Sequence, residues 1–207
     1  SYKLGNPAIF SHDLSTGARN RVAWYGGSNI SPAPSPDGSK VAMILSKDGW
    51  TDLYVANADG SNLKRLTKSK EDESAPCWSH DSKWICFASK ISERRSLCKV
   101  SASGGPVERI PTSGILNPTE PDWSPDGKWI AFTAQMGTFE LCVVPSQGGA
   151  VIELVPGEDP SWSPNSRTLI FARHEAGRLA LLDVFTKQWK DIARVASGVN
   201  SQPNWAK

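Results

Sequence analysis

The stretch WSPDGKWIAF, residues 123–132, decides the fold because it recurs along the chain. Similar segments occupy residues 76–87, 160–171 and 32–43, the last with Pro34 in place of the first Trp. A fifth copy begins at Pro203-Asn204-Trp205. The prolines that open the copies stand at positions 32, 76, 121, 160 and 203, a spacing of 39 to 45 residues. Such a period is typical of one propeller blade of four strands.

Each copy divides into four predicted strands. The Pro-x-Trp-Ser piece is a first short strand, and Pro-Asp-Gly is a tight turn in which Pro presets φ and Gly supplies a positive φ. In the copy that starts at Pro121, the following strands are expected at residues 129–134, 140–144 and 151–155. Links this short make the four strands sequential and antiparallel. The sequence therefore predicts an all-β propeller of four-stranded antiparallel blades.

The two ends of the chain are expected to complete one another. Residues 8–13 and 21–25 resemble a third and a fourth strand, whereas 203–205 resemble a first strand. We therefore expect residues 1–31 and 201–207 to form a composite closing blade through pairing of the N- and C-terminal strands. The prediction is a five-bladed ring that occupies residues 1–207 as a single domain. The interval from Trp205 across the closure to Pro34 is only 36 positions, 2 to the C-terminus and 34 from the N-terminus. The second strand of the closing blade must therefore be short, such as residues 2–4.

Composition and charge limit the function. The 207 residues are 39% hydrophobic and 21% charged, with a formal net charge of +2. So small a net charge argues against nucleic acid or an anionic membrane as the main partner. No run of 18 apolar residues occurs, so we expect no membrane insertion. The opening residues do not form a signal peptide, and any such peptide is expected to be absent or already removed.

The repeated aromatic and acidic residues are predicted to be structural. Trp78, Trp123, Trp162 and Trp205 are expected to pack between neighbouring blades. The turn residues Asp37, Asp81, Asp126 and Asn165 are expected to accept hydrogen bonds from nearby backbone N–H groups. An alternative interpretation is a calcium-binding ring, but one Asp per separate turn does not supply the six to eight converging oxygens that calcium needs.

The cysteines are also predicted to be packing residues. Cys86 aligns with Ala42, Ala131 and Ile170 in the other repeats. Cys98 and Cys142 share one position with Tyr54 and Ala180, and Cys77 lies in a strand-like stretch. None of the four has C-x-x-C spacing, so we expect buried free thiols rather than a metal or redox site.

No catalytic set emerges from the sequence. His12, His80 and His174 fall at different places in their repeats, and neither a G-x-S-x-G nor an H-E-x-x-H motif is present. We therefore predict that the chain is not an enzyme and needs no metal or cofactor. An enzyme that uses the central channel is the alternative.

A partner is expected on one face of the ring. In a four-strand meander, the second-to-third loops and the links between blades leave from the same end. We call this end the long-loop face; it comprises residues 47–50, 68–74, 90–95, 113–120, 157–159 and 197–202. Acidic side chains outnumber basic ones in the first five segments, which favours a protein or peptide partner over nucleic acid.

Several residues of the long-loop face are candidates for partner binding. Trp50 is the leading one, because an aromatic residue in a Lys-Asp-Gly-Trp-Thr loop is difficult to explain as core. The alternative is that these are ordinary solvated loop residues. We expect a monomer, although an incomplete blade could exchange a terminal strand with a second copy. The predicted binding residues are Trp50, Glu73, Arg94, Arg95, Asn117, Glu120, Asp159, Asn200 and Gln202.

The repeats resemble those of TolB-type propellers. The resemblance rests on residues 123–132, on DLYVANADG at 52–60 and on LKRLT at 63–67, and it extends over essentially the whole chain. It implies a bacterial periplasmic or otherwise exported protein of the Tol–Pal envelope system. It also implies that one propeller face binds the peptidoglycan-associated lipoprotein. Similar repeats form the gating propeller of prolyl-oligopeptidase-type peptidases and the sensor regions of larger envelope proteins, and both remain alternatives.

Overall fold

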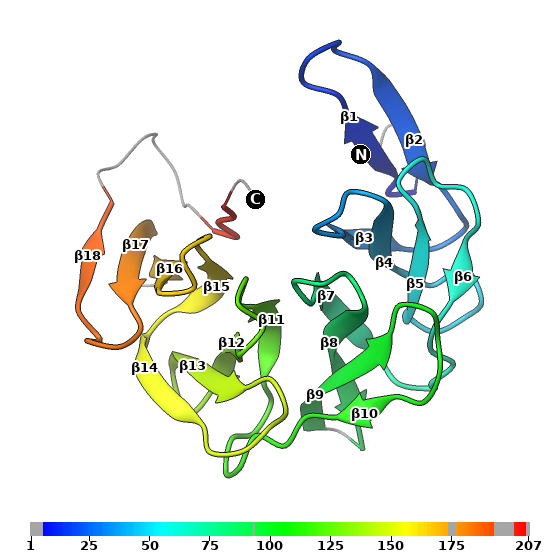
Figure 1. Cartoon of the computed structure of the whole chain (residues 1–207). Coiled ribbons are helices and arrows are strands. Elements are labelled where there is room, and N and C mark those ends of the chain that lie inside the picture. Colours follow the sequence, from blue (N-terminus) through cyan, green and yellow to red (C-terminus); the bar gives the residue numbers. More distant parts are fainter. Residues whose placement is uncertain (1–5, 93, 174–176, 193–200, 206–207) are drawn as a thin grey trace.

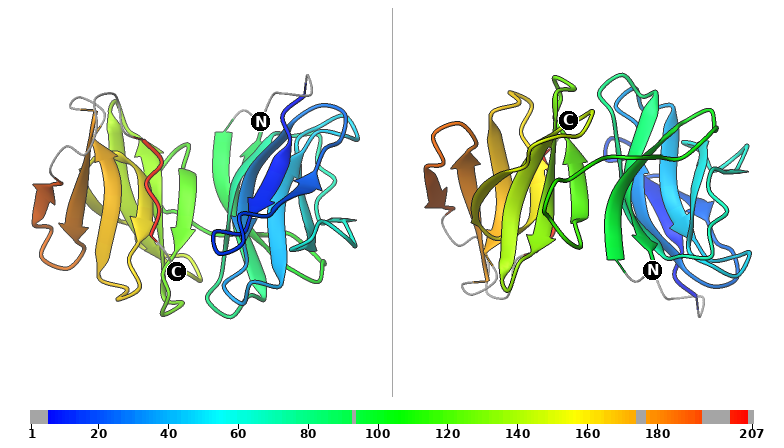
Figure 2. Two further views of the ribbon diagram at one scale, coloured as in Figure 1. Left: turned by 90° about the horizontal axis from the view of Figure 1, so that it is seen from above. Right: turned by 90° about the horizontal axis from the view of Figure 1, so that it is seen from below.

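The chain folds into a ring of β-sheets in which four blades are complete (Figure 1). The computed structural model describes residues 6–92, 94–173, 177–192 and 201–205. Within each blade the strands are antiparallel and follow sequence order, with the first strand innermost. The predicted propeller class and the four-stranded blades are thereby confirmed. Figure 2 shows that the strands of each blade run through the thickness of the ring.

The strand bounds follow the repeat closely. The first blade contains β3 (Asn29–Pro34), β4 (Lys40–Leu45), β5 (Asp52–Asn57) and β6 (Lys64–Arg65). The second contains β7 (Glu73–Trp78), β8 (Trp84–Ile91), β9 (Arg94–Ser101) and β10 (Glu108–Arg109). The third contains β11 (Thr119–Trp123), β12 (Trp129–Gln135), β13 (Phe139–Pro145) and β14 (Ile152–Pro156). The fourth contains β15 (Glu158–Trp162), β16 (Thr168–Arg173), β17 (Arg178–Asp183) and β18 (Trp189–Asp191).

The tight turn between the first two strands is built in the same way in every blade. In the third blade, Ser124 Oγ donates to Asp126 Oδ1 at 2.6 Å and accepts from the Trp129 backbone N–H at 2.9 Å. The Lys128 N–H donates to the same carboxylate at 3.1 Å. The serine–acid bond recurs at Ser35, Ser79 and Ser163, the last with Asn165 as acceptor. The predicted capping role of these turn residues is confirmed.

The repeated tryptophans join neighbouring blades, as predicted. Trp78 packs among residues of β4, β5, β8 and β9, and Trp123 and Trp162 hold the same position at the next two blade interfaces. Trp78 Nε1–H also donates to the backbone oxygen of Ala33 in the preceding blade at 2.8 Å. The core is therefore a series of apolar layers between blades.

The residue before each repeat-opening proline adopts a left-handed backbone conformation. Ser31, Ala75, Glu120, Asp159 and Gln202 have φ values between 49° and 53°. The register of the first strand shifts at this residue in each of the four complete blades. Non-glycine residues seldom take this conformation. Because it recurs in every repeat, we interpret it as part of the blade architecture, a bulge that turns the incoming chain into the inner strand.

The cysteines are buried free thiols, as predicted. Cys98 and Cys142 pair across their sheets with Phe87 and Phe132, in the same register in which Tyr54 pairs with Met43. Burial raises the pKa of both thiols to about 12. They are therefore protonated packing residues.

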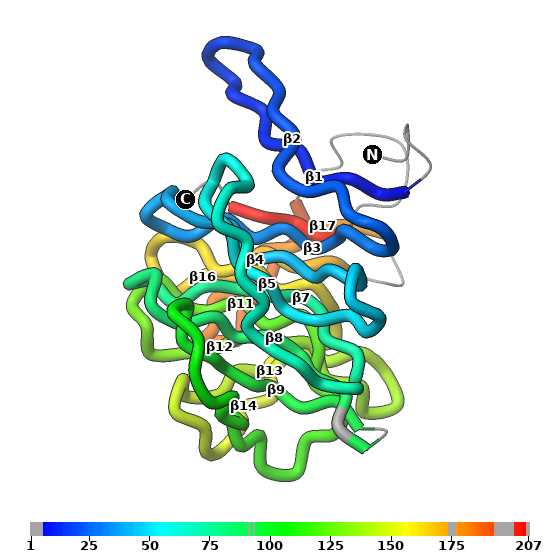
Figure 3. The backbone as a smooth tube through the Cα atoms, turned by 90° about the vertical axis from the view of Figure 1, so that its right-hand side faces the viewer, coloured from blue at the N-terminus to red at the C-terminus, as the bar shows by residue number. Residues whose placement is uncertain are grey.

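The two ends of the chain require a correction to the predicted closure. Strands β1 (Ile9–His12) and β2 (Arg19–Ala23) form a two-stranded sheet of their own, and among the described residues no strand joins them to 203–205. Figure 1 shows the hairpin β1–β2 and the C-terminal segment on opposite sides of an opening in the ring, and Figure 3 shows the hairpin projecting from it. The short second strand expected at residues 2–4 lies outside the described residues.

Each end is held by the blade next to it. Ile9, Val22 and Ala23 of the hairpin pack against Met43 and Tyr54 of the first blade. At the other end, Trp205 Nε1–H donates to Ser161 O at 3.1 Å, in the fourth blade. These contacts hold each end on the blade next to it. No helix able to cross a membrane occurs in the described part of the chain.

Candidate functional site

Trp50 is exposed on a loop that its neighbours hold in place. Its side chain is 50% exposed in the link between β4 and β5. On one side, Asp48 Oδ2 accepts a hydrogen bond from the Tyr54 hydroxyl at 2.7 Å. On the other, Thr51 Oγ1 donates to Asp72 Oδ1 at 2.9 Å, which ties this loop to the link between the first two blades. The indole is therefore presented to solvent from an anchored loop, as a partner-binding aromatic residue requires.

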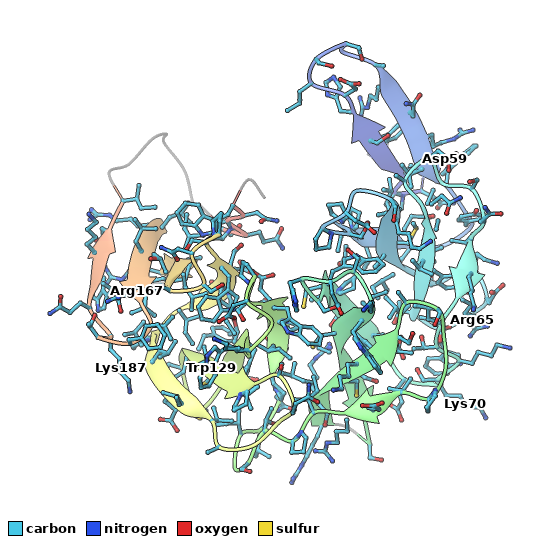
Figure 4. All side chains as sticks on the ribbon, in the orientation of Figure 1. Asp59, Arg65, Lys70, Trp129, Arg167 and Lys187 are labelled. Atoms are coloured by element: carbon cyan, nitrogen blue, oxygen red, sulfur yellow. The ribbon has the colours of Figure 1, made fainter. Side chains whose placement is uncertain are left out.

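A network of ion pairs connects that loop to the outer strand of the first blade. Arg65, labelled on the outer strand of the first blade in Figure 4, binds Asp52 Oδ2 at 2.5 Å and lies 3.7 Å from Asp48 Oδ2. Asp52 is fully buried, and burial raises the pKa of its carboxyl while Arg65 opposes that shift. The Asp48 pKa is lowered, chiefly by the hydrogen bond from Tyr54. The charged groups of this network pair with one another. Trp50, on the same loop as Asp48, is instead exposed to solvent.

The structure corrects the predicted placement of Glu73 on the binding surface. It is only 4% exposed, and its carboxylate accepts hydrogen bonds from the Leu53 N–H at 2.9 Å and from the Thr67 hydroxyl. Ser69 Oγ lies within hydrogen-bond distance of its other oxygen, at 3.1 Å. Burial is the main cause of its raised pKa. Glu73 organises the link between the first two blades and does not face a partner.

Three predicted residues lie side by side at the inner edge of the long-loop face. Glu120 Oε2 accepts from the Asp159 N–H at 3.1 Å and from Thr133 Oγ1 at 2.7 Å. Asp159 Oδ2 in turn accepts from the Gln202 N–H at 2.9 Å. In each case the carboxylate of the bulge residue in one repeat accepts a hydrogen bond from the backbone N–H of the bulge residue in the next repeat. Burial raises the pKa of both Glu120 and Asp159, and their mutual repulsion acts in the same direction on Glu120.

The remaining predicted residues occupy different settings. Arg95 donates its backbone N–H to Asn117 Oδ1 and its guanidinium to Ser74 Oγ, both at 3.0 Å. This pair therefore fastens the link that follows β10 to the start of β9. Arg94 is exposed, and Asn200 lies outside the described residues. Trp50 and Arg94 are the exposed candidates of the set, together with Gln202.

The sequence did not reveal an aromatic slot on the same face. A hollow of about 450 Å³ lies between the third and fourth blades, lined by Phe139 and Trp189 among others. The Arg173 guanidinium carbon lies 4.3 Å from the centre of the Trp189 ring, and Asp191 holds Arg173 by bonds of 2.9 and 3.1 Å. The two aromatic residues are 38% and 45% exposed. Phe139 and Trp189 come from two different blades, and only the folded ring shows that the two side chains lie close together.

No group of three or more His, Cys, Asp or Glu residues is placed to hold a metal ion within the ranges the structure describes. His80 has a structural contact: it packs against the next turn so closely that a Cβ at Gly127 would lie 2.5 Å from its ring. His174 lies outside the described ranges.

A protein-family model described as the TolB beta propeller domain matches residues 1–207. The chain belongs to this family. The Tol-Pal system protein TolB of Francisella tularensis subsp. tularensis is 38% identical over 69 residues, which is 32% of this chain and 16% of that protein. The crystal structure of TolB from Acinetobacter baumannii superposes with a TM-score of 0.87 at 26% identity.

That superposition covers 100% of this chain and 53% of the Acinetobacter protein, so the chain spans about half the length of the solved TolB it matches. A putative TolB from Agrobacterium tumefaciens has a TM-score of 0.78 at 19% identity, over 89% of this chain and 73% of that one, and shows the shared fold. The predicted TolB-like family is confirmed. The partners and location of the full-length relatives enter below as proposals.

Proposed function

We propose that this TolB-family propeller is a non-catalytic scaffold that binds a protein or peptide through its long-loop face. The observation that carries the proposal is the half-exposed Trp50 on a loop anchored at both sides. A loop that is already held in place loses little conformational freedom when the aromatic residue it carries binds a partner. Exposed aromatics and arginines are also the residue types that dominate protein interfaces.

We propose the cellular setting of such a scaffold from its relatives. Curated members similar to this chain carry the name Tol-Pal system protein TolB. We therefore propose an exported, periplasmic protein that works as a monomer and takes an envelope protein as its partner. The peptidoglycan-associated lipoprotein is the first partner to test.

The test is a titration of purified peptidoglycan-associated lipoprotein into the chain by calorimetry. Trp50→Ala should weaken binding at least tenfold, since truncation of an interface aromatic typically costs about 2 kcal/mol or more. Arg94→Ala should weaken it less, because that side chain is exposed and lies at the rim. Glu120 is a poor probe, because its replacement would disturb the bond to the next blade.

Phe185→Ala is the matched control. Phe185 is an exposed aromatic residue, 66% exposed, in the β17–β18 turn on the opposite face. It should leave the affinity unchanged. Binding that survives Trp50→Ala and Arg94→Ala, or that falls equally in the Phe185→Ala control, would remove the long-loop face from the role proposed for it.

A fifth blade shared by the two chain ends within a single domain is part of this proposal, although the described residues show no strand pairing between those ends. It is supported by the two half-blades at the ends: β1 and β2 pack on the first blade, and Trp205 repeats on the fourth blade the backbone hydrogen bond made by Trp78. Small-angle X-ray scattering would test it. If the two ends come together as a fifth blade in solution, the radius of gyration should be smaller than that calculated for the ring with its opening. A value equal to that of the open ring would contradict the fifth blade.

A further inference from the structure

A second hollow lies on the face opposite the long loops, between the first and second blades. It has a volume of about 720 Å³ and is bounded by the starts of β4, β6 and β8 and by the ends of β5 and β9. Among its described lining residues there are three lysines and no acidic residue. The lysines are Lys40, Lys64 and Lys83. Asparagine and serine side chains make up most of its other polar lining.

The neighbouring repeats show that this charge is specific to one blade interface. Lys40 begins its second strand where the next two blades have Trp84 and Trp129. Lys64 pairs with Val55 of the adjacent strand, and the equivalent pair in the second blade is Glu108 with Lys99. At the next interface a tryptophan and an acid therefore replace two of the lysines. At that next interface Glu108 lies 3.6 Å from Lys99 and compensates its charge, whereas no acidic residue that the structure describes lines the hollow of the first interface.

Two of the three lysines, Lys64 and Lys83, make contacts that leave their ammonium groups at the hollow. Lys64 Nζ reaches across the interface to Ser103 O, and a Cβ at Gly104 would lie 3.1 Å from it, so this glycine leaves room for the ammonium. The Lys83 side chain is 76% exposed and lies 3.7 Å from Asp81, a weak pair.

The nearest other carboxylates are engaged in their own turns. Asp37 accepts hydrogen bonds from Ser35 and Ser39. Asp59, labelled at the edge of the first blade in Figure 4, accepts from Ser61. Asp37 also attracts Lys40 electrostatically, so it compensates part of the charge from outside the hollow, but neither carboxylate lines the hollow itself.

We propose that this hollow binds a ligand that carries clustered phosphate groups. Lysine ammoniums act as point charges for phosphate oxygens, and amide and hydroxyl groups supply additional donors. Trp84 and Ala102 provide an apolar wall for the uncharged part of such a ligand. The site is separate from the long-loop face and does not depend on the function proposed for it.

The experiment uses two probes that distinguish the source of the phosphates. Sodium tripolyphosphate represents a soluble ligand and is titrated by calorimetry at low and at physiological salt. Vesicles of phosphatidylcholine with phosphatidylglycerol represent a lipid source and are compared with pure phosphatidylcholine in a flotation assay. We expect binding to at least one phosphate probe, weakened by salt because the charges are exposed.

The repeats supply the matched variants. Lys83→Gln and Lys128→Gln remove the same charge from the same turn position, and each lysine pairs with its turn acid at 3.7 and 3.5 Å, but only Lys83 lines the hollow. Lys40→Gln with Lys83→Gln should weaken binding about fivefold or more, at about two- to fivefold for each exposed ion pair. Lys128→Gln should leave it unchanged.

Lys40→Trp is a second, independent variant. It introduces the residue that the next two repeats have at this position and should fill the hollow while preserving the fold. Binding should then be lost, whereas the unfolding midpoint should be unchanged. Binding that falls equally with Lys128→Gln would show non-specific attraction and overturn the proposal. Absence of binding to both phosphate probes would overturn it as well.

Discussion

Trp78 and Trp162 occupy the same position in two repeats, yet replacing them by Phe should have different costs. Both indoles are buried, with exposures of 5% and 1%. Trp78 Nε1–H donates to Ala33 O at 2.8 Å. Trp162 Nε1 is buried without a hydrogen-bond partner among the described residues. The pair therefore separates the contribution of the ring from that of its hydrogen bond.

The magnitudes follow from these contacts. Exchange of Trp for Phe removes part of a buried ring, which costs about 1 to 2 kcal/mol at either site. At Trp78 the exchange also leaves a buried carbonyl without its donor, for about 1 to 3 kcal/mol more. At Trp162 it removes an unsatisfied N–H, which offsets the loss by a similar amount. Trp78→Phe should thus lower the free energy of unfolding by about 2 to 5 kcal/mol, and Trp162→Phe should change it by about 1 kcal/mol or less.

The assay is urea unfolding followed by far-ultraviolet circular dichroism, with the midpoint and slope fitted for each variant. Trp123→Phe provides an intermediate reference, because its Nε1–H donates within its own turn to Gly127 O at 3.2 Å. Equal losses at Trp78 and Trp162, with unchanged slopes, would refute the reasoning.

Three further predictions concern the turns, the hairpin and the bulge. Ser124→Ala removes a fully buried hydroxyl that bonds the turn residue Asp126 and the first residue of β12, and should cost about 1 to 3 kcal/mol in urea unfolding. Gly60→Ala places a Cβ 2.3 Å from a backbone oxygen of β2 and should speed proteolysis of the hairpin β1–β2, whereas Gly38→Ala, also at positive φ but in open space, should not. Burial raises the pKa of Glu120, so its ionisation lowers stability as pH rises from the unfolded-state pKa toward the folded one. Glu120→Gln should therefore stabilise the fold more at neutral pH than below pH 4.5, and an equal effect at both would contradict this.

The blade pattern could be predicted from sequence because each repeat carries its own local instructions. The Pro-Asp-Gly turn, the alternating strand residues and the repeated Trp act within a few residues or between adjacent copies. The same register aligned Cys98 and Cys142 with Tyr54 and Ala180, and in the structure all four pair with a residue at one equivalent position of the adjacent strand: Phe87, Phe132, Met43 and Phe171. Local chemistry repeated several times is the strongest signal that a single sequence offers.

The closure and part of the binding surface could not be predicted, for different physical reasons. Closure depends on contacts between residues nearly 200 positions apart, which no local pattern records. Glu73 looked like a surface acid because its loop is polar, but its side chain turns inward to hydrogen bonds that the folded loop creates. The aromatic slot likewise requires Phe139 and Trp189 to meet across two blades.

The repeats also distinguish structure from function within one chain. A feature present in every copy, such as the left-handed residue before the proline or the serine–acid turn, serves the blade itself. A departure in one copy has no such explanation and needs another. Lys40 stands where two blades have a tryptophan and the fourth has Thr168, and it lines a hollow together with two other lysines. This arrangement costs stability, because apolar burial is lost and like charges are brought together. A blade interface that accepts that cost is where binding of an anionic ligand is most reasonably sought.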